Sequence, residues 1–296
     1  MSTPKHLPAW YDAGNPIAPT ATQWATLTES ERRAVCAALP IEVEHDFMSE
    51  GDAHARAVLE SAEMLTNHFG GGGSGPRRFY LGKSLMVYYP GEAGFAPDLF
   101  LVFDVEDHDR NSYVVSAEGR PLDFVLEVIS EGDAKKDLVR NVARYARLGI
   151  PEYFVLDLNR RRLHGFRLPP GSTVYQPLLP QLGRFTSDVL GLHLGMEGRR
   201  LRFYVGEAAV PTAREVRERI QASLDETAES LRLEAQRAET EAQRAETEAQ
   251  RAETEAQRAE TEAQRAETEA QRAAEAMQRV AELERRLAQL TRPEPA

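Results

Sequence analysis

The sequence predicts an α+β protein with an α/β core, in which a mixed sheet with a crossover helix precedes one long C-terminal helix. Three observations lead to this prediction. Nearly all aromatic residues fall between about residues 41 and 208, short apolar segments there surround one helical segment, and a seven-residue repeat fills much of the remainder. Aromatic side chains dominate the energetics of packed cores, so the folded domain should lie where they gather.

Three segments follow from the composition of the 296-residue chain. Residues 1–40 form an extension rich in proline, alanine and threonine, with one short helix that begins at Thr28, which can form a capping box with Glu31. Residues 41–208 form the folded domain. Residues 212–291 form a helical arm, because this stretch has no aromatic residue and is built from strong helix formers.

Each element expected in the folded domain follows from hydrophobic spacing and its bounding residues. Residues 52–68 carry apolar side chains at helical intervals after an acidic start, which predicts a helix. The glycine run 70–75 lacks the lysine and hydroxyl residue of a phosphate-binding loop, so a flexible loop is expected. Apolar, β-branched or aromatic segments predict four strands: 84–89, 98–105, 124–129 and 153–157.

Residues 134–148 are expected to form a helix that Gly149 and Pro151 end. The order of strand, helix and strand is typical of a crossover unit, and strands this apolar are usually buried on both faces. Alternating segments after residue 158 predict further antiparallel strands that close the domain: 162–167, 192–196 and 201–205.

The arm contains the repeat AQRAETE five times without an error, over residues 235–269. Seven residues is the coiled-coil period, and the alanines form one narrow stripe along the helix. Alanine buries little area, so we expect weak self-association, with larger residues near the ends, such as Leu224 and Leu283, setting any oligomer or binding a protein partner. A stiff, solvated spacer without a partner is the alternative, and both interpretations stay open.

Composition excludes several classes of protein. No stretch approaches the roughly 18 to 20 apolar residues of a membrane span, and the start lacks the pattern of a secretory signal, so a cytoplasmic protein without a membrane partner is expected. The single cysteine, Cys36, excludes an internal disulfide and a cysteine-rich zinc site, and we expect it to be a small buried residue. The net charge of −11 means that DNA binding would need a local basic face or metal ions.

Two carboxylates interrupt segments that should be apolar strands. Asp98 follows Pro97 and begins DLFLVFDV, and Glu127 lies inside DFVLEVIS. A carboxylate inside a buried strand is costly unless it is paired, protonated or bound to a cation. If the two strands are neighbours, both groups could hold one Mg²⁺ ion, which takes few protein carboxylates and keeps several waters. The simpler interpretation makes Asp98 a cap at the strand entry and Glu127 one half of a buried ion pair.

The segments FAPDLFLVF, PLDFVLEVIS and KKDLVRNVARYARLGIPEYFVLD follow one another in an order that resembles the restriction-endonuclease family of the Uma-two kind. That family belongs to the PD-(D/E)XK nuclease superfamily, and the resemblance covers about residues 40–206. It implies a restriction-endonuclease-like mixed sheet, an Mg²⁺ or Mn²⁺ cofactor and a DNA substrate. It also implies that Asp98 and Glu127 are the catalytic, metal-binding acids, and His54 matches a histidine commonly found at the start of the first helix.

One position departs from the family pattern. The family usually carries a lysine on the crossover helix one turn before the tyrosine that is Tyr145 here, and that position is Asn141. Arg140, Lys135 and Lys136 are nearby cations, and none of them matches the pattern cleanly. A lysine would offset charge on the phosphate in the transition state, and loss of such a donor can cost about 10²-fold or more in rate.

The sequence therefore predicts an Mg²⁺- or Mn²⁺-dependent endonuclease that hydrolyses phosphodiester bonds in DNA, with Asp98 and Glu127 holding the ion. Arg140 or Lys136 would replace the missing cation. The alternative is a catalytically degenerate nuclease-fold binding module whose arm mediates protein association. Asn141 and the acidic net charge favour the binding module, whereas the intact pair of acids favours the enzyme.

Overall fold

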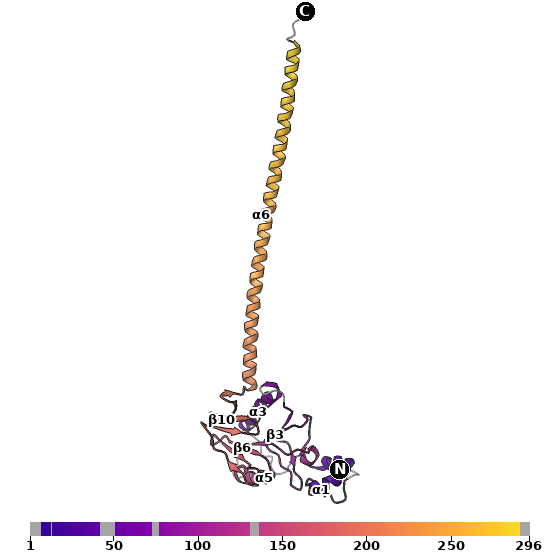
Figure 1. The fold of residues 1–296 in the computed structure, drawn as a ribbon, viewed down its shortest axis with the longest axis vertical. Helices are drawn as coiled ribbons and strands as arrows, with labels where there is room; N and C mark the ends of the chain where they lie inside the picture. Colours follow the sequence, from indigo (N-terminus) through magenta and orange to yellow (C-terminus); the bar gives the residue numbers. More distant parts are fainter. Residues whose placement is uncertain (1–6, 13, 42–50, 73–76, 131–135, 291–296) are drawn as a thin grey trace, which may run out of the picture. The chain divides into compact units, whose positions relative to one another are not determined.

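The computed structural model describes the chain except for residues 1–6, 13, 42–50, 73–76, 131–135 and 291–296. Its contacts divide the chain into two units, Met1–Glu218 and Arg219–Ala296. A mixed α/β sheet core is followed by one long C-terminal helix, as the sequence predicts (Figure 1). The three segments predicted from composition stay a prediction.

Among the described residues, six strands form the main sheet, in the order β1-β3-β5-β6-β7-β8. Their bounds are β1 (Phe79–Lys83), β3 (Leu99–Phe103), β5 (Phe124–Ile129), β6 (Glu152–Asp157), β7 (Arg162–Arg167) and β8 (Gln176–Pro177). β5 and β6 are parallel, and the other neighbouring pairs are antiparallel. Every residue of β3, β5 and β6 is buried, which explains why these segments are almost continuously apolar.

The edge of the main sheet differs from the prediction. The strand expected over 84–89 is reduced to β2 (Val87–Tyr88), which pairs in parallel with β4 (Tyr113–Val114) outside the main sheet. The edge strand is instead β1, which the sequence analysis missed because Gly82 and a lysine interrupt its apolar run. Gly82 is required there, because a Cβ atom would collide with the ring of Phe100 on β3.

A helix and a second sheet cover one face of the main sheet. The helix is α3 (Asp52–Asn67), and it shares one hydrophobic core with side chains of β3, β5 and β6. The second sheet is antiparallel and contributes to the same core, with the strands β9 (Arg184–Ser187), β10 (Leu192–Glu197), β11 (Arg200–Val205) and β12 (Ala208–Ala209). The predicted helix 52–68 and the predicted late strands are thereby confirmed to within one residue.

Four short helical elements lie outside these layers. They are the π-helical turn η1 (His68–Gly72), the helix α4 (Val115–Glu118) and the N-terminal helices α1 (Ala21–Thr26) and α2 (Glu29–Ala38). The capping box at the start of α2 is confirmed, because the Glu31 amide donates to Thr28 Oγ1 at 3.3 Å and the Thr28 amide donates to Glu31 Oε2 at 2.8 Å. Cys36 of α2 is half-buried, and burial raises the pKa of its thiol. The glycine run enters η1, and its remainder lies outside the described residues.

The other face of the main sheet is covered by α5 (Asn141–Arg147), the predicted crossover helix between the parallel strands β5 and β6. Its first turn is π-helical, η2 (Lys136–Arg140), and the predicted residues 134 and 135 lie outside the described residues. The helix ends as expected, since Gly149 takes a left-handed φ of 77° and the Ile150 amide donates to the Tyr145 carbonyl at 3.1 Å. Single π-helical turns are frequent at functional sites.

Glu152, at the start of β6, is a buried carboxylate that joins the two sheets. It is 1% exposed, accepts hydrogen bonds from the Ser187 hydroxyl and, at 2.9 Å, the Asp188 amide, and pairs with Arg167 at 2.9 Å. The substitution Glu152→Ala is expected to lower the free energy of unfolding by about 3 kcal/mol, because it leaves a partly buried guanidinium without this partner. Urea unfolding measures the change, with Glu152→Gln as the milder control. A loss below about 1 kcal/mol would contradict the role given to Glu152.

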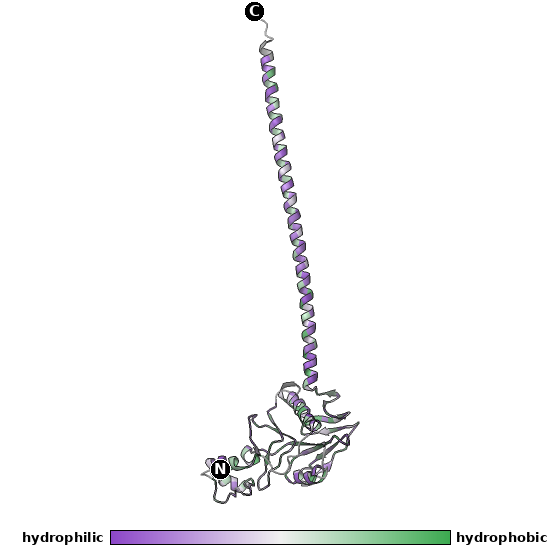
Figure 2. Ribbon diagram, turned by 180° about the vertical axis from the view of Figure 1, so that it is seen from behind, coloured by the Kyte–Doolittle hydropathy of each residue, from purple (hydrophilic) through white to green (hydrophobic). Residues whose placement is uncertain are grey.

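The described residues of the second unit all lie in the helix α6 (Ala213–Leu290), which has 78 residues. At 1.5 Å per residue, such a helix is about 117 Å long. Figure 2 shows hydrophilic residues along its whole length, and the larger apolar residues Leu224 and Leu283 are 58% and 62% exposed. No described helix has the length and apolar character needed to cross a membrane. Self-association through the arm and binding of a protein partner stay predictions.

The first residues of α6 belong to the first unit, because Glu215 bonds to the guanidinium of Arg202 on β11 at 3.1 Å and accepts the Thr212 amide at 2.8 Å. A chain that ends at Glu218 is therefore expected to unfold cooperatively. A chain that ends at Pro211 is expected to be less stable by about 2 kcal/mol, because Arg202 loses a charged partner. Thermal unfolding followed by circular dichroism compares the two truncated chains. Equal stability would contradict the role of Glu215, and non-cooperative melting of the longer chain would place the boundary further along α6.

Candidate metal-binding site

Asp98 and Glu127 lie side by side because β3 and β5 are neighbouring strands. Leu99 of β3 pairs with Leu126 of β5, so Asp98, immediately before β3, falls opposite Glu127. The Asp98 amide donates to Glu127 Oε2 at 3.2 Å, and the Val128 amide donates to Asp98 Oδ2 at 2.6 Å. Backbone amides next to one acid therefore hold the carboxylate of the other.

His54 joins this pair from the first turn of α3. Its Nε2 atom lies 3.0 Å from Asp98 Oδ2, and the two side chains are 7% and 17% exposed. The start of α3 therefore lies next to the end of β3 at which Asp98 is placed. The structure thus brings together the two acids and the histidine that the sequence analysis selected.

Tyr145 and Asn141 reach Glu127 from the opposite layer, α5. The Tyr145 hydroxyl donates to Glu127 Oε1 at 2.6 Å, and Asn141 Nδ2 lies 3.4 Å from the same oxygen. Asn141 Nδ2 also donates to Asp137 Oδ1 at 3.0 Å, the shorter of its two contacts. Asn141, where the family resemblance implies a lysine, is therefore a buried amide that bridges two carboxylates.

Asp137 is the acidic residue that the sequence analysis missed. It lies in the segment KKDLVR, where neighbouring lysines and an arginine suggest a solvated start of a helix. The structure places it in η2, with its carboxylate on Asn141 and its carbonyl accepting the Tyr153 hydroxyl at 3.0 Å. Its spacing of four residues from Asn141 and eight from Tyr145 could have identified it, because such positions share one face of a helix.

Burial and neighbouring negative charge raise the pKa of two carboxylates of the site, Glu127 and Asp137. Burial raises the pKa of Glu127 well above its usual value, and the charges of Asp98 and Asp137 raise it further. Burial raises the pKa of Asp137 to about 6, with Lys136 opposing the shift and Asp98 adding to it. Burial and the charge of Glu127 also raise the pKa of Tyr145, so its hydroxyl remains a donor. The site holds more negative charge than its surroundings compensate, and this favours binding of a cation.

The predicted auxiliary cations Lys136 and Arg140 affect the site through the electrostatic effect of their charges on Asp137. Lys136 and Arg140 both lower the pKa of Asp137, and Arg140 is exposed at the end of η2. Lys135, the third candidate, lies outside the described residues. Neither described cation occupies the position of Asn141 between the two carboxylates.

The oxygen atoms of the two acids are suited to a hard divalent cation. Within the described part of the chain, Asp98 Oδ1 accepts no hydrogen bond and Glu127 Oε2 accepts one, from the Asp98 amide. Mg²⁺ is commonly held by one or two protein carboxylates and keeps several waters, so this donor set fits it. Among the described residues, no group of three or more His, Cys, Asp and Glu side chains has the arrangement of a metal site.

Comparison with models of known protein families agrees with the resemblance seen in the sequence. The family model described as "Putative restriction endonuclease" (Uma2) matches residues 44–201, more than half of the chain. A solved structure, of a "putative nuclease belonging to DUF820 from Anabaena variabilis ATCC 29413", is similar at 14% identity and a TM-score of 0.35, covering 55% of this chain and 88% of that chain. No curated protein matches. The family match shows that the chain belongs to the Uma2 family of restriction-endonuclease-like proteins.

Proposed function

We propose that this protein is a divalent-metal-dependent endonuclease that hydrolyses phosphodiester bonds in DNA. The observation that carries the proposal is the convergence of Asp98 and Glu127, two carboxylates on neighbouring strands, in a site where burial and mutual repulsion raise the pKa of Glu127. Such an arrangement is unfavourable for the fold by itself and favourable for a bound cation. Membership of a family described as restriction endonucleases supports the same reaction.

In this proposal, Asp98 and Glu127 hold Mg²⁺ or Mn²⁺. A bound ion of this kind lowers the pKa of a coordinated water and polarises a phosphoryl oxygen. The chain's own residues orient the two acids: His54 and the Val128 amide hold Asp98, and the Tyr145 hydroxyl holds Glu127. These contacts restrict both carboxylates, so little reorganisation is needed when a cation binds.

A second candidate function is a nuclease-fold binding module without catalysis. The observation that favours it is Asn141, whose side-chain amide is neutral and donates to Glu127 and Asp137. This amide is therefore not available to a substrate phosphate. If the protein is an enzyme, Lys136 or Arg140 of η2 would have to supply the positive charge beside the phosphate.

Calorimetric titration of the full chain with Mg²⁺ or Mn²⁺, paired with a plasmid cleavage assay, tests the proposal. Wild type is expected to bind one ion and to nick the plasmid, and Asp98→Asn is expected to lose both properties. Asp109→Asn, on an exposed loop, is the matched control and should behave as wild type. Binding without cleavage would move the conclusion to the binding module, and absence of binding would reject the metal site.

A further inference from the structure

A groove with a cationic rim lies between the start of α3 and the turn that joins β10 to β11. This α3 groove has a volume of about 340 Å³. Its floor is apolar, because Leu158 and Leu201 line it and are buried. The charged residues that line it are three arginines and one glutamate: Arg56, Arg199, Arg200 and Glu60.

Two of the three arginines are free to meet an anion. Arg200 lies 3.8 Å from Glu60, the one carboxylate among the lining residues. Within the described part of the chain, Arg56 and Arg199 form no ion pair, and both residues are exposed. The α3 groove therefore carries net positive charge in a protein whose net charge is −11. It supplies the local basic face that an acidic protein needs in order to bind a polyanion.

The helix α3 connects this groove to the acids. His54, whose Nε2 atom lies 3.0 Å from Asp98 Oδ2, belongs to the first turn of α3. Its neighbour Ala53 lines the groove, as does Arg56 two residues further along. One end of α3 therefore contacts the candidate metal site and borders the groove.

The strand β6 gives a second link between the groove and the acids. Leu158 follows the last residue of β6, and its amide donates at 2.9 Å to the carbonyl of Ile129, the last residue of β5. Glu127 lies two residues before Ile129 on β5. Since neighbouring strands are about 4.8 Å apart and rise about 3.3 Å per residue, the backbones of Leu158 and Glu127 are separated by roughly 11 Å.

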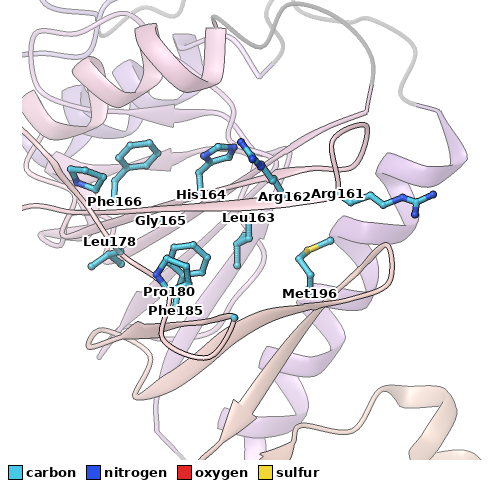
Figure 3. A pocket seen from close by; sticks show the side chains of 12 residues that line it. Arg161, Arg162, Leu163, His164, Gly165, Phe166, Leu178, Pro180, Phe185 and Met196 are labelled. Carbon is cyan, nitrogen blue, oxygen red and sulfur yellow. The ribbon is translucent and has the colours of Figure 1, made fainter.

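The turn between β6 and β7 adds positive charge at the same end of the sheet. Three exposed arginines follow Asn159 there: Arg160, Arg161 and Arg162. Figure 3, a view of the neighbouring cavity beside β7, shows the side chain of Arg161 extending away from that strand. Arg160 pairs with the buried Asp157 at 3.0 Å, whereas Arg161 forms no ion pair with a described residue. The end of the sheet next to the acids is therefore rich in arginine.

We propose that the α3 groove binds the sugar–phosphate backbone of DNA close to the scissile phosphate, with the guanidinium groups of Arg56 and Arg199 on phosphate oxygens. The inference rests on the proposed function, because it assumes a phosphodiester that reacts at Asp98 and Glu127. A guanidinium presents donors in a fork that matches phosphate geometry, and the apolar floor suits the sugar.

The distance between the groove and the acids sets the position of this contact on the DNA. Phosphates of one strand follow one another every 3.4 Å along the helix axis, so roughly 11 Å corresponds to about three nucleotides. Contacts of this kind position the nucleic acid and do not read its sequence. The groove should therefore contribute to affinity for DNA of any sequence.

Fluorescence anisotropy of a labelled DNA duplex, titrated with the full chain in Ca²⁺ at several salt concentrations, tests the inference. The double variant Arg56→Glu with Arg199→Glu is expected to weaken binding by at least about tenfold and to reduce the salt slope by about two, the contribution of two phosphate contacts. The double variant Arg56→Lys with Arg199→Lys should retain most of the binding, because it keeps both charges.

Arg78→Glu is the matched control, because Arg78 is an exposed arginine at the opposite end of the main sheet. It precedes Phe79, which pairs with Phe103 at the end of β3, whereas Asp98 precedes the start of β3. This charge reversal should leave the affinity for DNA unchanged. Thermal unfolding of each variant confirms that it is folded.

The outcomes separate this inference from the proposed function. Equal losses in the double glutamate variant and in Arg78→Glu, no loss in the double variant, or no DNA binding by wild type would each overturn the role of the groove. Binding that depends on Arg56 and Arg199 in a protein that never cleaves DNA would support the groove and reject the nuclease. Cleavage by wild type with a KM that the double variant leaves unchanged would reject the groove and support the nuclease.

Discussion

Replacing Asn141 with lysine is expected to raise metal-dependent DNA cleavage by about 10-fold to 100-fold, since a single donor to a developing charge is commonly worth this much or more. Asn141 Nδ2 lies 3.0 Å from Asp137 Oδ1 and 3.4 Å from Glu127 Oε1, so an ammonium group there would meet two carboxylates. In the proposed reaction, the longer lysine side chain would also reach a substrate phosphate held beside the acids. Because that contact strengthens in the transition state, the gain should appear in kcat more than in KM.

Single-turnover cleavage of plasmid DNA in Mg²⁺ measures this effect. Asn141→Met supplies a long side chain without charge and should give no gain. The double variant Asn141→Lys with Glu127→Ala should lose the gain, because the acid that holds the ion is gone. If Asn141→Lys cleaves DNA no faster than an active wild type, the missing lysine is not what limits the reaction. If no variant cleaves DNA although metal binding is confirmed, the binding module becomes the better conclusion.

Glu127→Gln is expected to remove the stabilisation that divalent metal gives to the fold. An ion present at 100 times its dissociation constant stabilises the native state by about 2.7 kcal/mol, and a variant that no longer binds the ion loses all of it. Glutamine preserves the shape of the side chain and an acceptor for Tyr145, so the variant should remain folded. Thermal unfolding with and without Mg²⁺ should therefore give a metal-induced rise in Tm for wild type and none for Glu127→Gln.

Glu106→Gln is the matched control, because Glu106 is an exposed acid on the loop after β3. It should keep the full metal-induced rise in Tm. A rise retained in Glu127→Gln would mean that the ion binds at another place on the protein.

Local sequence was sufficient to predict the strands at the centre of the sheet. The predicted strand 124–129 coincides with β5, because burial on both faces leaves an almost continuous apolar run that only Glu127 interrupts. That interruption is itself the signal of the site, since a buried carboxylate needs a compensating partner. β1 was missed because its fit depends on the contact of Gly82 with Phe100, a property of the neighbouring strand.

The composition of the site depends on tertiary structure that local patterns do not contain. The interrupted apolar strands pointed to Asp98 and Glu127, and the resemblance to a family added His54. The pairing of β3 with β5 and the position of α3 explain why the three residues meet. Asp137 was missed because a helix start beside charged residues suggests solvent, whereas the π-helical turn η2 brings this residue over the acids. The bridging contacts of Asn141 follow from the same turn.

The identical repeats of α6 allow the length of this helix to change without a change in its local contacts. In each of the five repeats, the threonine hydroxyl donates to the carbonyl of the glutamine four residues earlier at 2.8 Å, so the repeats are interchangeable in their contacts. Gain or loss of one repeat changes the helix by about 10.5 Å and turns the residues beyond it by only about 20°. Variants of this chain that differ only in the number of repeats should therefore fold equally well and differ only in the length of α6.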